Sequence, residues 1–480
     1  MAEPLKKNAG IALVWSFIDK GGQQIIQLVV GCILARLLVP DQFGLVAVLS
    51  IFTAIANLLQ DSGFSSALVR KKNVLDGEYT SVFYFNIAIG LSLYAILFFC
   101  APLIANYYDK PILTNLSRFI FLSFVFNSFG IIQNINLIRK MDFKTNTRIT
   151  LIAGCISGII AIIMALYGFG VWSLAAQLVI QNFLRNLFLW IFIKWKPSGR
   201  FSFSYIKEMS AFSFKLLSTG LMNQVCTNIY PIIIGKYFSF SQTGLYGQAY
   251  KLNTIPQSVI SEGLKSVVYP MLTKTTDEEQ TIRAFRKTIR VASFISFPVA
   301  LILTVMAPSI VRILLGNSWD AAIPILQILA VGGSVFPMYS LYATLLQYKG
   351  HSGSFFNMEL IKNVLYLISI IISIQFGVLG LVIGMSAINV IIFFIGSYFF
   401  IGKLTTYSLR NVLSDIFPYL VIAIISFAPL YFLNQLISNP ILLLIVQLLI
   451  GASLYLLIVK LLGSKVLDDF IGMIRKNNKQ

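Results

Sequence analysis

The sequence predicts an all-α polytopic membrane protein with about fourteen transmembrane helices, arranged as two pseudo-symmetric six-helix lobes in parallel repeat plus two C-terminal helices. Of the 480 residues, 57% are hydrophobic and only 11% are charged, whereas a soluble domain carries about 25% charged residues. Apolar runs of about 20 residues, the length of a membrane-spanning helix, recur along nearly the whole chain. Short segments of the first half also recur in the second half at a nearly constant distance.

The first apolar run contains Asp19 and Lys20 and continues far beyond a signal-peptide core, so we interpret it as a span that is kept. Several turns between later runs are very short, which makes the helices that they join antiparallel neighbours. The predicted spans lie near residues 11–37, 41–60, 80–105, 112–136, 147–167, 170–193, 209–236, 242–264, 291–313, 321–346, 357–376, 379–401, 413–434 and 440–462.

The same corner between two apolar runs occurs twice. The segment "ARLLVPDQFGLVA" starts at Ala35 and "GKYFSFSQTGLYG" starts at Gly235, 200 residues later. "FGVWSL" at Phe169 similarly resembles "FGVLGL" at Phe376. Aligning the two corners pairs Arg36 with Lys236, Gln42 with Gln242, Gly44 with Gly244 and Leu45 with Leu245.

These matches divide the chain into three parts. Residues 1–200 form an N-lobe with spans one to six, residues 201–405 form a C-lobe with spans seven to twelve, and residues 406–480 form two additional helices and a tail. Because six is even, both copies cross the membrane in the same direction, which makes a parallel repeat. Many transporters place their substrate at the interface of such repeats.

Lysine and arginine predict the orientation. If the chain starts on the cytoplasmic side, 28 of the 37 basic residues lie in cytoplasmic segments, and four lie in outer turns (Arg36, Lys110, Lys236 and Arg312). Such an excess is typical of cytoplasmic loops. Both termini are therefore expected in the cytoplasm, and the net charge of +19 does not indicate a nucleic-acid partner.

The other five basic residues fall inside predicted spans, where a charge costs a few kcal/mol unless it faces a cavity or a partner. Only Asp19 is a clear acidic counterpart, so a shared cavity would be positive and would favour an anionic ligand. Polar residues three and four apart form stripes on the first, sixth and seventh spans. The basic residues are Lys20, Arg118, Arg185, Lys215 and Lys251, and the stripes are Ser16, Lys20, Gln23 and Gln27; Ser173, Gln177, Gln181 and Arg185; and Lys215, Thr219, Asn223 and Thr227.

Structural roles explain part of this pattern equally well. Arg118 and Arg185 are within reach of the membrane surfaces by snorkelling. Lys20 could pair with helix neighbours alone, and polar stripes can serve as hydrogen-bonding contacts between helices. These alternatives cover the glutamines better than the cations.

Several function classes lack their motifs. No G-x-x-x-x-G-K-[ST] sequence occurs, which argues against a built-in ATPase. The single histidine, His351, has no cysteine or carboxylate cluster beside it, so we expect no metal site and no cofactor. No predicted outer loop exceeds about ten residues, which leaves little room for a catalytic site.

Four segments carry a family resemblance: Ala35–Asn73, "GFGVWSLAAQ" from Gly168, "GLYGQAYKLNTIPQSVI" from Gly244 and "LLGNSWDAAIPILQILA" from Leu314. Together they resemble the Wzx-type polysaccharide and O-antigen flippases, in the branch of lipopolysaccharide, colanic acid and teichuronic acid exporters. This branch belongs to the multidrug/oligosaccharidyl-lipid/polysaccharide exporter superfamily. The resemblance covers most of the chain up to about residue 405 and is carried by the order of loose motifs.

The resemblance implies translocation of an undecaprenyl-diphosphate-linked oligosaccharide across a bacterial inner membrane, with proton or sodium antiport. Polysaccharide polymerase and chain-length proteins are the expected protein partners, beside membrane lipids. We expect the cations to contact the diphosphate or acidic sugars, the amides to bind sugar hydroxyls, and a carboxylate to couple the ion. The substrate candidates are Lys20, Gln23, Gln24, Arg118, Gln177, Gln181, Arg185, Lys215, Asn223 and Gln224, and the coupling candidates are Asp19, Asp61 and Glu262.

Four alternatives remain. A drug exporter of the same superfamily would need buried acids, which are scarce here. A lipid II flippase also has fourteen spans and a basic cavity. A non-transporting scaffold for polysaccharide enzymes would have no need of membrane cations, and a polymerase is disfavoured by the short outer loops.

Overall fold

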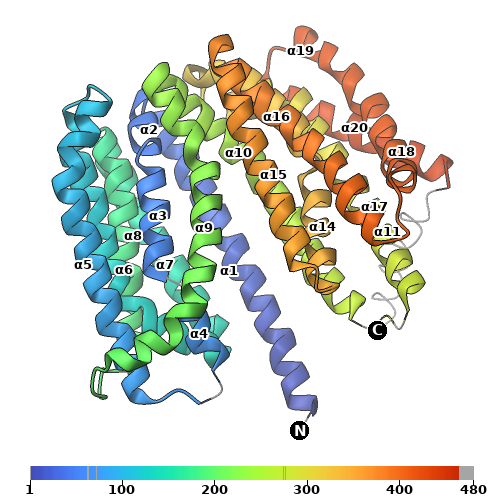
Figure 1. Ribbon diagram of the computed structural model, residues 1–480. Helices are drawn as coiled ribbons and strands as arrows, with labels where there is room; N and C mark the ends of the chain where they lie inside the picture. The colour runs from blue at the N-terminus through green and yellow to red at the C-terminus, as the bar shows by residue number, and fades with distance from the viewer. Residues whose placement is uncertain (1, 62–63, 72, 274, 276, 464–480) are drawn as a thin grey trace. The chain divides into compact units, whose positions relative to one another are not determined.

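The computed structural model describes residues 2–61, 64–71, 73–273, 275 and 277–463, and the side chains of 2–14, 16–17, 61, 66, 210–219, 269–270 and 352 are outside this description. Within these ranges all regular elements are helical (Figure 1). Ten segments are long and apolar enough to cross a membrane. The prediction of an all-α polytopic membrane protein is confirmed, while the count of fourteen spans stays a prediction.

The chain divides into two compact units, Met1–Gly244 and Leu245–Gln480. The first unit therefore includes a helix that the sequence repeat assigns to the second copy, α9 (Phe203–Tyr237). The division into lobes at residues 200 and 405 remains a prediction that rests on the repeat.

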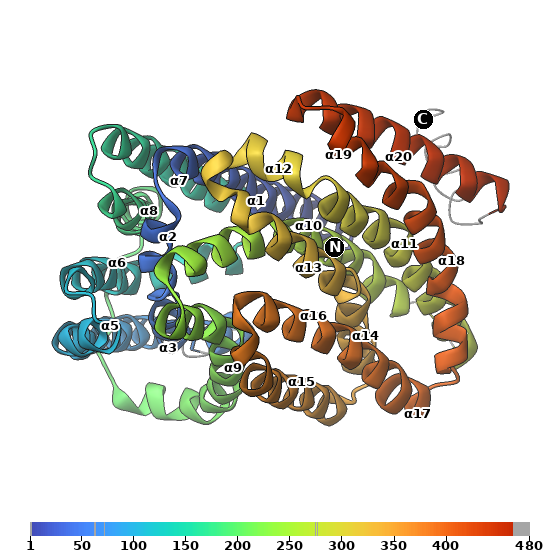
Figure 2. The ribbon, with the colours of Figure 1, turned by 90° about the horizontal axis from the view of Figure 1, so that it is seen from above.

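In the first unit, five helices follow one another as neighbours in the order α5, α6, α8, α7 and α1 (Figure 2). The α3 helix packs against α9, α6 and α5. The bounds are α1 (Ala2–Leu37), α2 (Pro40–Ala47), α3 (Ser50–Asp61), α4 (Phe64–Arg70), α5 (Asp76–Tyr107), α6 (Ile112–Arg139), α7 (Phe143–Leu166) and α8 (Val171–Phe192).

A buried carboxylate stabilises the turn between α4 and α5 at one end of this unit. Glu78 is fully buried. It accepts hydrogen bonds from Lys71 Nζ at 2.5 Å and from the Leu75 backbone N–H at 3.0 Å. The hydrogen bond to Glu78 raises the pKa of Lys71. This pair fixes the entry of α5.

The two repeated corners cross each other at glycine. A Cβ on Gly44 would overlap the Phe240 carbonyl, and a Cβ on Gly244 would overlap the Pro40 carbonyl. The contact is reciprocal, because residue 44 meets residue 240 while residue 244 meets residue 40. Glycine at both positions lets α2 and the start of α10 (Phe240–Leu272) approach with their backbones in contact.

In the second unit, α15, α16, α13, α11, α18 and α20 are successive neighbours (Figure 2). Buried aromatic residues form much of its core, with Tyr342 stacked on Phe393 at a centroid distance of 5.3 Å. Its larger helices are α11 (Glu278–Val305), α12 (Ala307–Leu314), α13 (Ile323–Gly333), α14 (Phe336–Tyr348), α15 (Ser352–Ser373), α16 (Gly377–Ile395), α18 (Leu409–Phe427) and α20 (Pro440–Leu461). Short elements are η1 (Asn317–Ala322), η2 (Ile374–Phe376), η3 (Gly396–Ile401), α17 (Gly402–Leu404), η4 (Ala428–Phe432) and α19 (Leu433–Leu436).

Adding a methyl group at either crossing glycine should destabilise the protein. We expect Gly44→Ala and Gly244→Ala each to lower the free energy of unfolding by about 1–3 kcal/mol, because the backbones must separate. Thermal unfolding of the purified protein in detergent measures this. Gly263→Ala is the control, since a Cβ there meets nothing within 4 Å. Equal unfolding temperatures for all three variants would contradict the crossing.

Candidate functional site

A cluster of polar side chains joins α1, α6, α7 and α8 near the end of the first unit that carries the α6–α7 turn. Small residues bring α1 and α7 close enough for this, because a Cβ on Gly22 would lie 2.8 Å from Leu151 Cδ2. The Thr147 hydroxyl of α7 also donates to the Trp15 carbonyl of α1 at 3.1 Å. The polar contacts described next depend on this close packing.

Asp19 is the acidic centre of the cluster. Its Oδ1 accepts a hydrogen bond from Gln23 Nε2 at 2.9 Å, and its Oδ2 accepts one from Asn146 Nδ2 at 3.1 Å. Gln23 lies one helical turn further along α1, and Asn146 belongs to the first turn of α7. Both oxygens of the carboxylate are therefore occupied by neutral amide donors from two helices.

Arg185 is the basic centre. It lies two turns before the end of α8, and its Nη2 donates to Asn134 Oδ1 of α6 at 3.0 Å. The Asp19 carboxylate and the Arg185 guanidinium attract each other. The structure thus combines a carboxylate, a guanidinium and three amides from four helices.

The cluster also has hydrogen-bonding capacity and positive charge beyond these contacts. Asn146 Oδ1 is buried and has no hydrogen-bond partner in the described part of the chain, so it can accept a further donor. Lys20, next to Asp19, has an exposed side chain and adds a second positive charge.

Arg118 lies elsewhere in the unit. It is separated from Asn134 by sixteen residues of α6, about 24 Å at the rise of an α-helix. Its guanidinium carbon lies 4.1 Å from the centre of the Phe98 ring, and its Nε donates to the Phe98 carbonyl at 3.3 Å. The structure does not bring Arg118 together with Arg185, and its contacts are those of a packing residue.

The predicted amides divide into two groups. On α8, Gln177 and Gln181 are half-buried, like Gln24 on α1, and a Cβ on Gly154 would lie 3.9 Å from Gln181 Nε2. On α9, Asn223 and Gln224 are also half-buried. Gln224 Oε1 accepts from Asn228 Nδ2 at 3.2 Å, and the Ser50 hydroxyl of α3 reaches Asn228 at 3.4 Å. The side chain of Lys215 lies outside the described residues.

The remaining coupling candidates differ from Asp19. Glu262 is half exposed, and its carboxylate lies 3.8 Å from Lys265 Nζ one turn further along α10. The side chain of Asp61 lies outside the described residues. Asp19 is therefore the candidate whose carboxylate is seen to accept hydrogen bonds from two neighbouring amides.

Sequence analysis missed a second charged cluster, in the second unit. Glu359 of α15 accepts hydrogen bonds from the Tyr339 hydroxyl of α14 at 2.8 Å and from Lys362 Nζ at 2.5 Å. The Glu359 and Lys362 side chains are only 13% and 20% exposed. An acidic and a basic residue three positions apart at the start of an apolar run was the available signal, but positive-inside counting placed Lys362 in a cytoplasmic segment.

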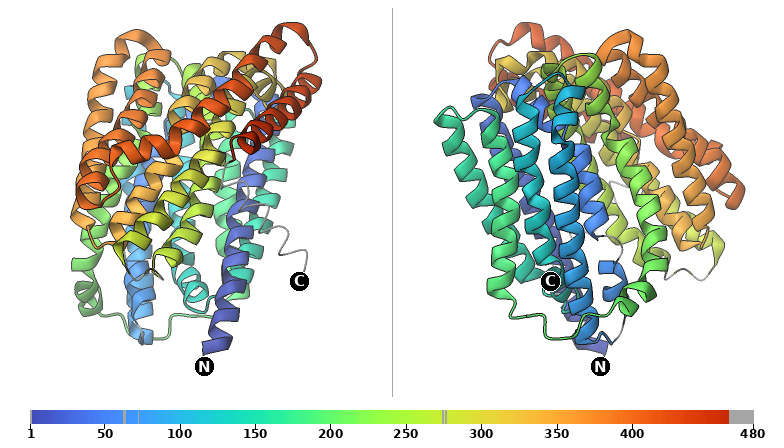
Figure 3. Two further views of the ribbon diagram at one scale, coloured as in Figure 1. Left: turned by 90° about the vertical axis from the view of Figure 1, so that its right-hand side faces the viewer. Right: turned by 60° about the vertical axis from the view of Figure 1, so that its left-hand side comes forward.

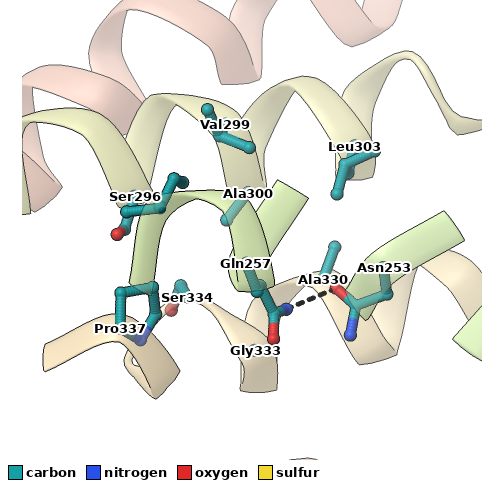
Figure 4. A pocket seen from close by; sticks show the side chains of 11 residues that line it. Asn253, Gln257, Ser296, Val299, Ala300, Leu303, Ala330, Gly333, Ser334 and Pro337 are labelled. Atoms are coloured by element: carbon teal, nitrogen blue, oxygen red, sulfur yellow. Dashed lines mark hydrogen bonds between the residues drawn. The ribbon is translucent and has the colours of Figure 1, made fainter. Parts of the chain in front are cut away.

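The second unit also contains a small cavity beside the break between α13 and α14 (Figure 4). Asn253 and Gln257 of α10 line one wall, where Gln257 Nε2 donates to Asn253 Oδ1 at 2.7 Å. Its volume of about 10 Å³ holds roughly one water molecule. This cavity is therefore no site for an oligosaccharide.

Comparison with known proteins identifies relatives along most of the chain. The model of a family described as "Polysaccharide biosynthesis protein" matches residues 33–324. The succinoglycan biosynthesis transport protein ExoT of Rhizobium meliloti is 28% identical and covers 76% of this chain and 73% of its own. The teichuronic acid biosynthesis protein TuaB of Bacillus subtilis is 26% identical over 80% of both chains. The lipopolysaccharide biosynthesis protein WzxC of Escherichia coli is 24% identical and covers 77% and 75%.

Solved structures share the fold. The lipid II flippase MurJ in an inward closed conformation matches with a TM-score of 0.78 at 18% identity, over 93% of this chain and 97% of its own. An inward-facing multidrug resistance MATE family transporter of the MOP superfamily matches with a TM-score of 0.64 at 17% identity, over 80% and 94%.

A double-mutant cycle tests the Asp19–Arg185 coupling. Asp19→Asn should lower the free energy of unfolding by about 1–3 kcal/mol, because a charge-assisted contact is lost. Arg185→Gln should cost less in the Asp19→Asn background than in the wild type. Thermal unfolding of the four proteins measures the coupling, and Arg118→Gln, whose cost should simply add, is the control. Strict additivity for Asp19 and Arg185 would refute the electrostatic coupling.

Two glutamate–lysine pairs of the second unit, each with its partners three residues apart on one helix, allow a matched comparison. Glu359→Gln should destabilise the protein by about 2–4 kcal/mol, because it leaves the Lys362 charge in a poorly hydrated place. Glu262→Gln, at an exposed pair of the same spacing, should cost under about 1 kcal/mol. Unfolding temperatures of the two variants provide the measurement, and a smaller loss for Glu359→Gln would be the contrary outcome.

Proposed function

Because the chain belongs to the family of polysaccharide biosynthesis proteins, we propose that it is a secondary transporter that flips undecaprenyl-diphosphate-linked oligosaccharide repeat units from the inner to the outer leaflet. The fold shared with flippases and exporters supports a transport role. The chain is a multi-pass membrane protein. We assign it to the bacterial inner membrane on the similarity to its bacterial relatives, and we place both termini in the cytoplasm on the distribution of its basic residues.

The observation that carries the proposal is the charged cluster of Asp19 and Arg185, with Lys20 beside it. Charges on membrane helices are expensive, and they are typical of substrate and ion pathways. A scaffold that only organised enzymes would gain nothing from them. The cluster also contains amides, the groups that bind sugar hydroxyls.

In the proposed mechanism, Lys20, Arg185 and Lys215 contact the diphosphate or acidic sugars. A guanidinium can donate two parallel hydrogen bonds to two oxygens of one phosphate. Its positive charge also offsets the free-energy cost of moving a diphosphate through a medium of low dielectric constant. The amides hydrogen-bond to sugar hydroxyls while the lipid tail stays in the bilayer. The lobes alternate between states open to either side, as in other transporters built from repeats.

We propose that a proton or sodium ion is coupled to transport through a carboxylate. Neutralising Asp19 would remove its electrostatic attraction for Arg185 and so change the charge of the cluster. Asp19 is the first candidate on its described contacts, followed by Asp61 and Glu262. Polysaccharide polymerase and chain-length proteins would receive the flipped repeat unit.

The similarity in fold to MurJ favours lipid II as the second candidate substrate. Both substrates present a diphosphate on a polyprenyl chain, so the same cationic groups would serve either. The glycan is the part that separates them, and the transport assay should include both.

Reconstituted protein should move a labelled undecaprenyl-diphosphate oligosaccharide to the opposite leaflet, faster with an imposed ion gradient. Arg185→Gln should reduce the rate by about 10-fold or more, because a charge-assisted contact to the diphosphate is lost. Arg118→Gln, which removes a cation of the same unit outside the cluster, should keep at least half of the rate. Leaflet exposure of the label is the readout.

Two results would contradict the proposal. One is flipping no faster than in empty liposomes, with folded protein and with both the oligosaccharide lipid and lipid II tried. The other is an Arg185→Gln rate equal to wild type at equal reconstitution, which would remove the cluster from the pathway.

A further inference from the structure

A second set of charges, outside the cluster described above, surrounds Asp415 of α18 in the second unit. Its Oδ2 accepts hydrogen bonds from Arg286 Nε at 2.9 Å and from the Tyr407 hydroxyl at 3.0 Å. Its Oδ1 accepts from Arg286 Nη2 at 3.1 Å and from Arg290 Nε at 2.7 Å, with Arg290 Nη2 at 2.6 Å. One carboxylate therefore orients two guanidinium groups of α11.

The charges of this group do not balance. Two arginines face one aspartate, so the group carries a surplus positive charge. The Asp415 side chain is 1% exposed, whereas Arg286 and Arg290 are 30% and 39% exposed. The described contacts to Asp415 use Nε and Nη2 of each arginine, which leaves the Nη1 groups outside these contacts and available to a second anion. The carboxylate therefore lies on the protein-interior side of the two guanidinium groups and orients them.

The group lies at the start of two apolar runs, where a membrane helix is expected to leave the headgroups and enter the hydrocarbon. In α11, the residues from Val291 to Val305 are all uncharged, and in α18 the uncharged run starts at Ile416. Arg290 and Asp415 directly precede these runs, at the boundary between hydrocarbon and headgroups. The Tyr455 hydroxyl of α20 donates to the Phe294 carbonyl at 2.9 Å. Lys460 lies five residues after Tyr455, and Arg290 lies four residues before Phe294, so this contact places the exposed Lys460 near the level of Arg290. The α18 and α20 helices are also neighbours (Figure 3).

We propose that Arg286 and Arg290 form a binding site for the phosphate headgroup of an anionic phospholipid, with Asp415 as the positioning residue. Paired guanidinium groups bind phosphate oxygens in a forked geometry. Basic pockets between transmembrane helices on the cytoplasmic side are typical sites for anionic headgroups. Positive-inside placement accounts for arginine at this depth, but it does not account for two arginines held by one buried carboxylate. The site requires only that the chain spans a membrane, and is independent of the flipped substrate.

The test uses the purified full chain in a neutral detergent, with phosphatidylglycerol or phosphatidylcholine added at equal concentration. Native mass spectrometry counts the bound lipids, and thermal unfolding measures the stabilisation. Wild type should bind phosphatidylglycerol in preference to phosphatidylcholine. Arg290→Gln should weaken phosphatidylglycerol binding about 10-fold, because it removes one charge-assisted contact and leaves Arg286 on Asp415.

Arg283→Gln is the matched control. Arg283 lies on the same helix with a side chain that is 67% exposed, and it faces Glu279 at 3.8 Å, so its loss should leave lipid binding unchanged. Arg290→Lys keeps the charge without the fork and should give an intermediate affinity. It also serves as the reference if Arg290→Gln unfolds.

Three outcomes would overturn the proposal. Equal affinity of the wild type for the two lipids would show that the headgroup charge is not recognised. Equal losses in Arg290→Gln and Arg283→Gln would show an effect of overall charge. Displacement of phosphatidylglycerol by an undecaprenyl diphosphate at a much lower concentration would assign the site to the transported lipid.

Discussion

The low dielectric constant of the bilayer is the constraint on which the arrangement of this protein depends. A charge on a membrane helix needs a partner, and in each described cluster at least one partner belongs to another helix. Asp19 joins α1 to α7, Arg185 joins α8 to α6, and Glu359 joins α15 to α14. Apolar surface alone gives little preference for one neighbour over another in lipid, because the tails are as apolar as leucine. The few charges and amides therefore help to decide which helices are neighbours.

The same constraint separates two kinds of cation. The guanidinium of Arg118 interacts with the ring and the backbone carbonyl of a single residue, Phe98. Neither partner carries a charge. Arg185 instead interacts with groups of two other helices, because it donates to the Asn134 amide of α6 and is attracted by the Asp19 carboxylate of α1. The number and kind of their partners distinguish the two residues.

The fold class followed from properties that a sequence displays directly, namely apolar length, charge placement and the repeated corner, and the family followed from a resemblance carried by the order of four motif segments. Contacts within one helix were also accessible, since Gln23 and Asp19 are four residues apart and hydrogen-bond in the structure. Asn134 and Asn146 were not predicted to belong to the cluster. Helical periodicity shows which residues share one face of a helix, but it does not show which other helix packs against that face. Lys362 was counted among the cytoplasmic basic residues, because a count of basic residues cannot recognise a lysine that Glu359 neutralises within the same turn.

The reciprocal crossing of Gly44 with Phe240 and of Gly244 with Pro40 has the form of an isologous contact, the kind that two identical subunits make across a two-fold axis. In a homodimer with such a contact, one mutation would alter both sides at once. In this single chain the two sides are separate positions that can vary independently, and proline at 40 aligns with phenylalanine at 240. The two halves of the predicted repeat are therefore chemically unequal at a crossing that both share.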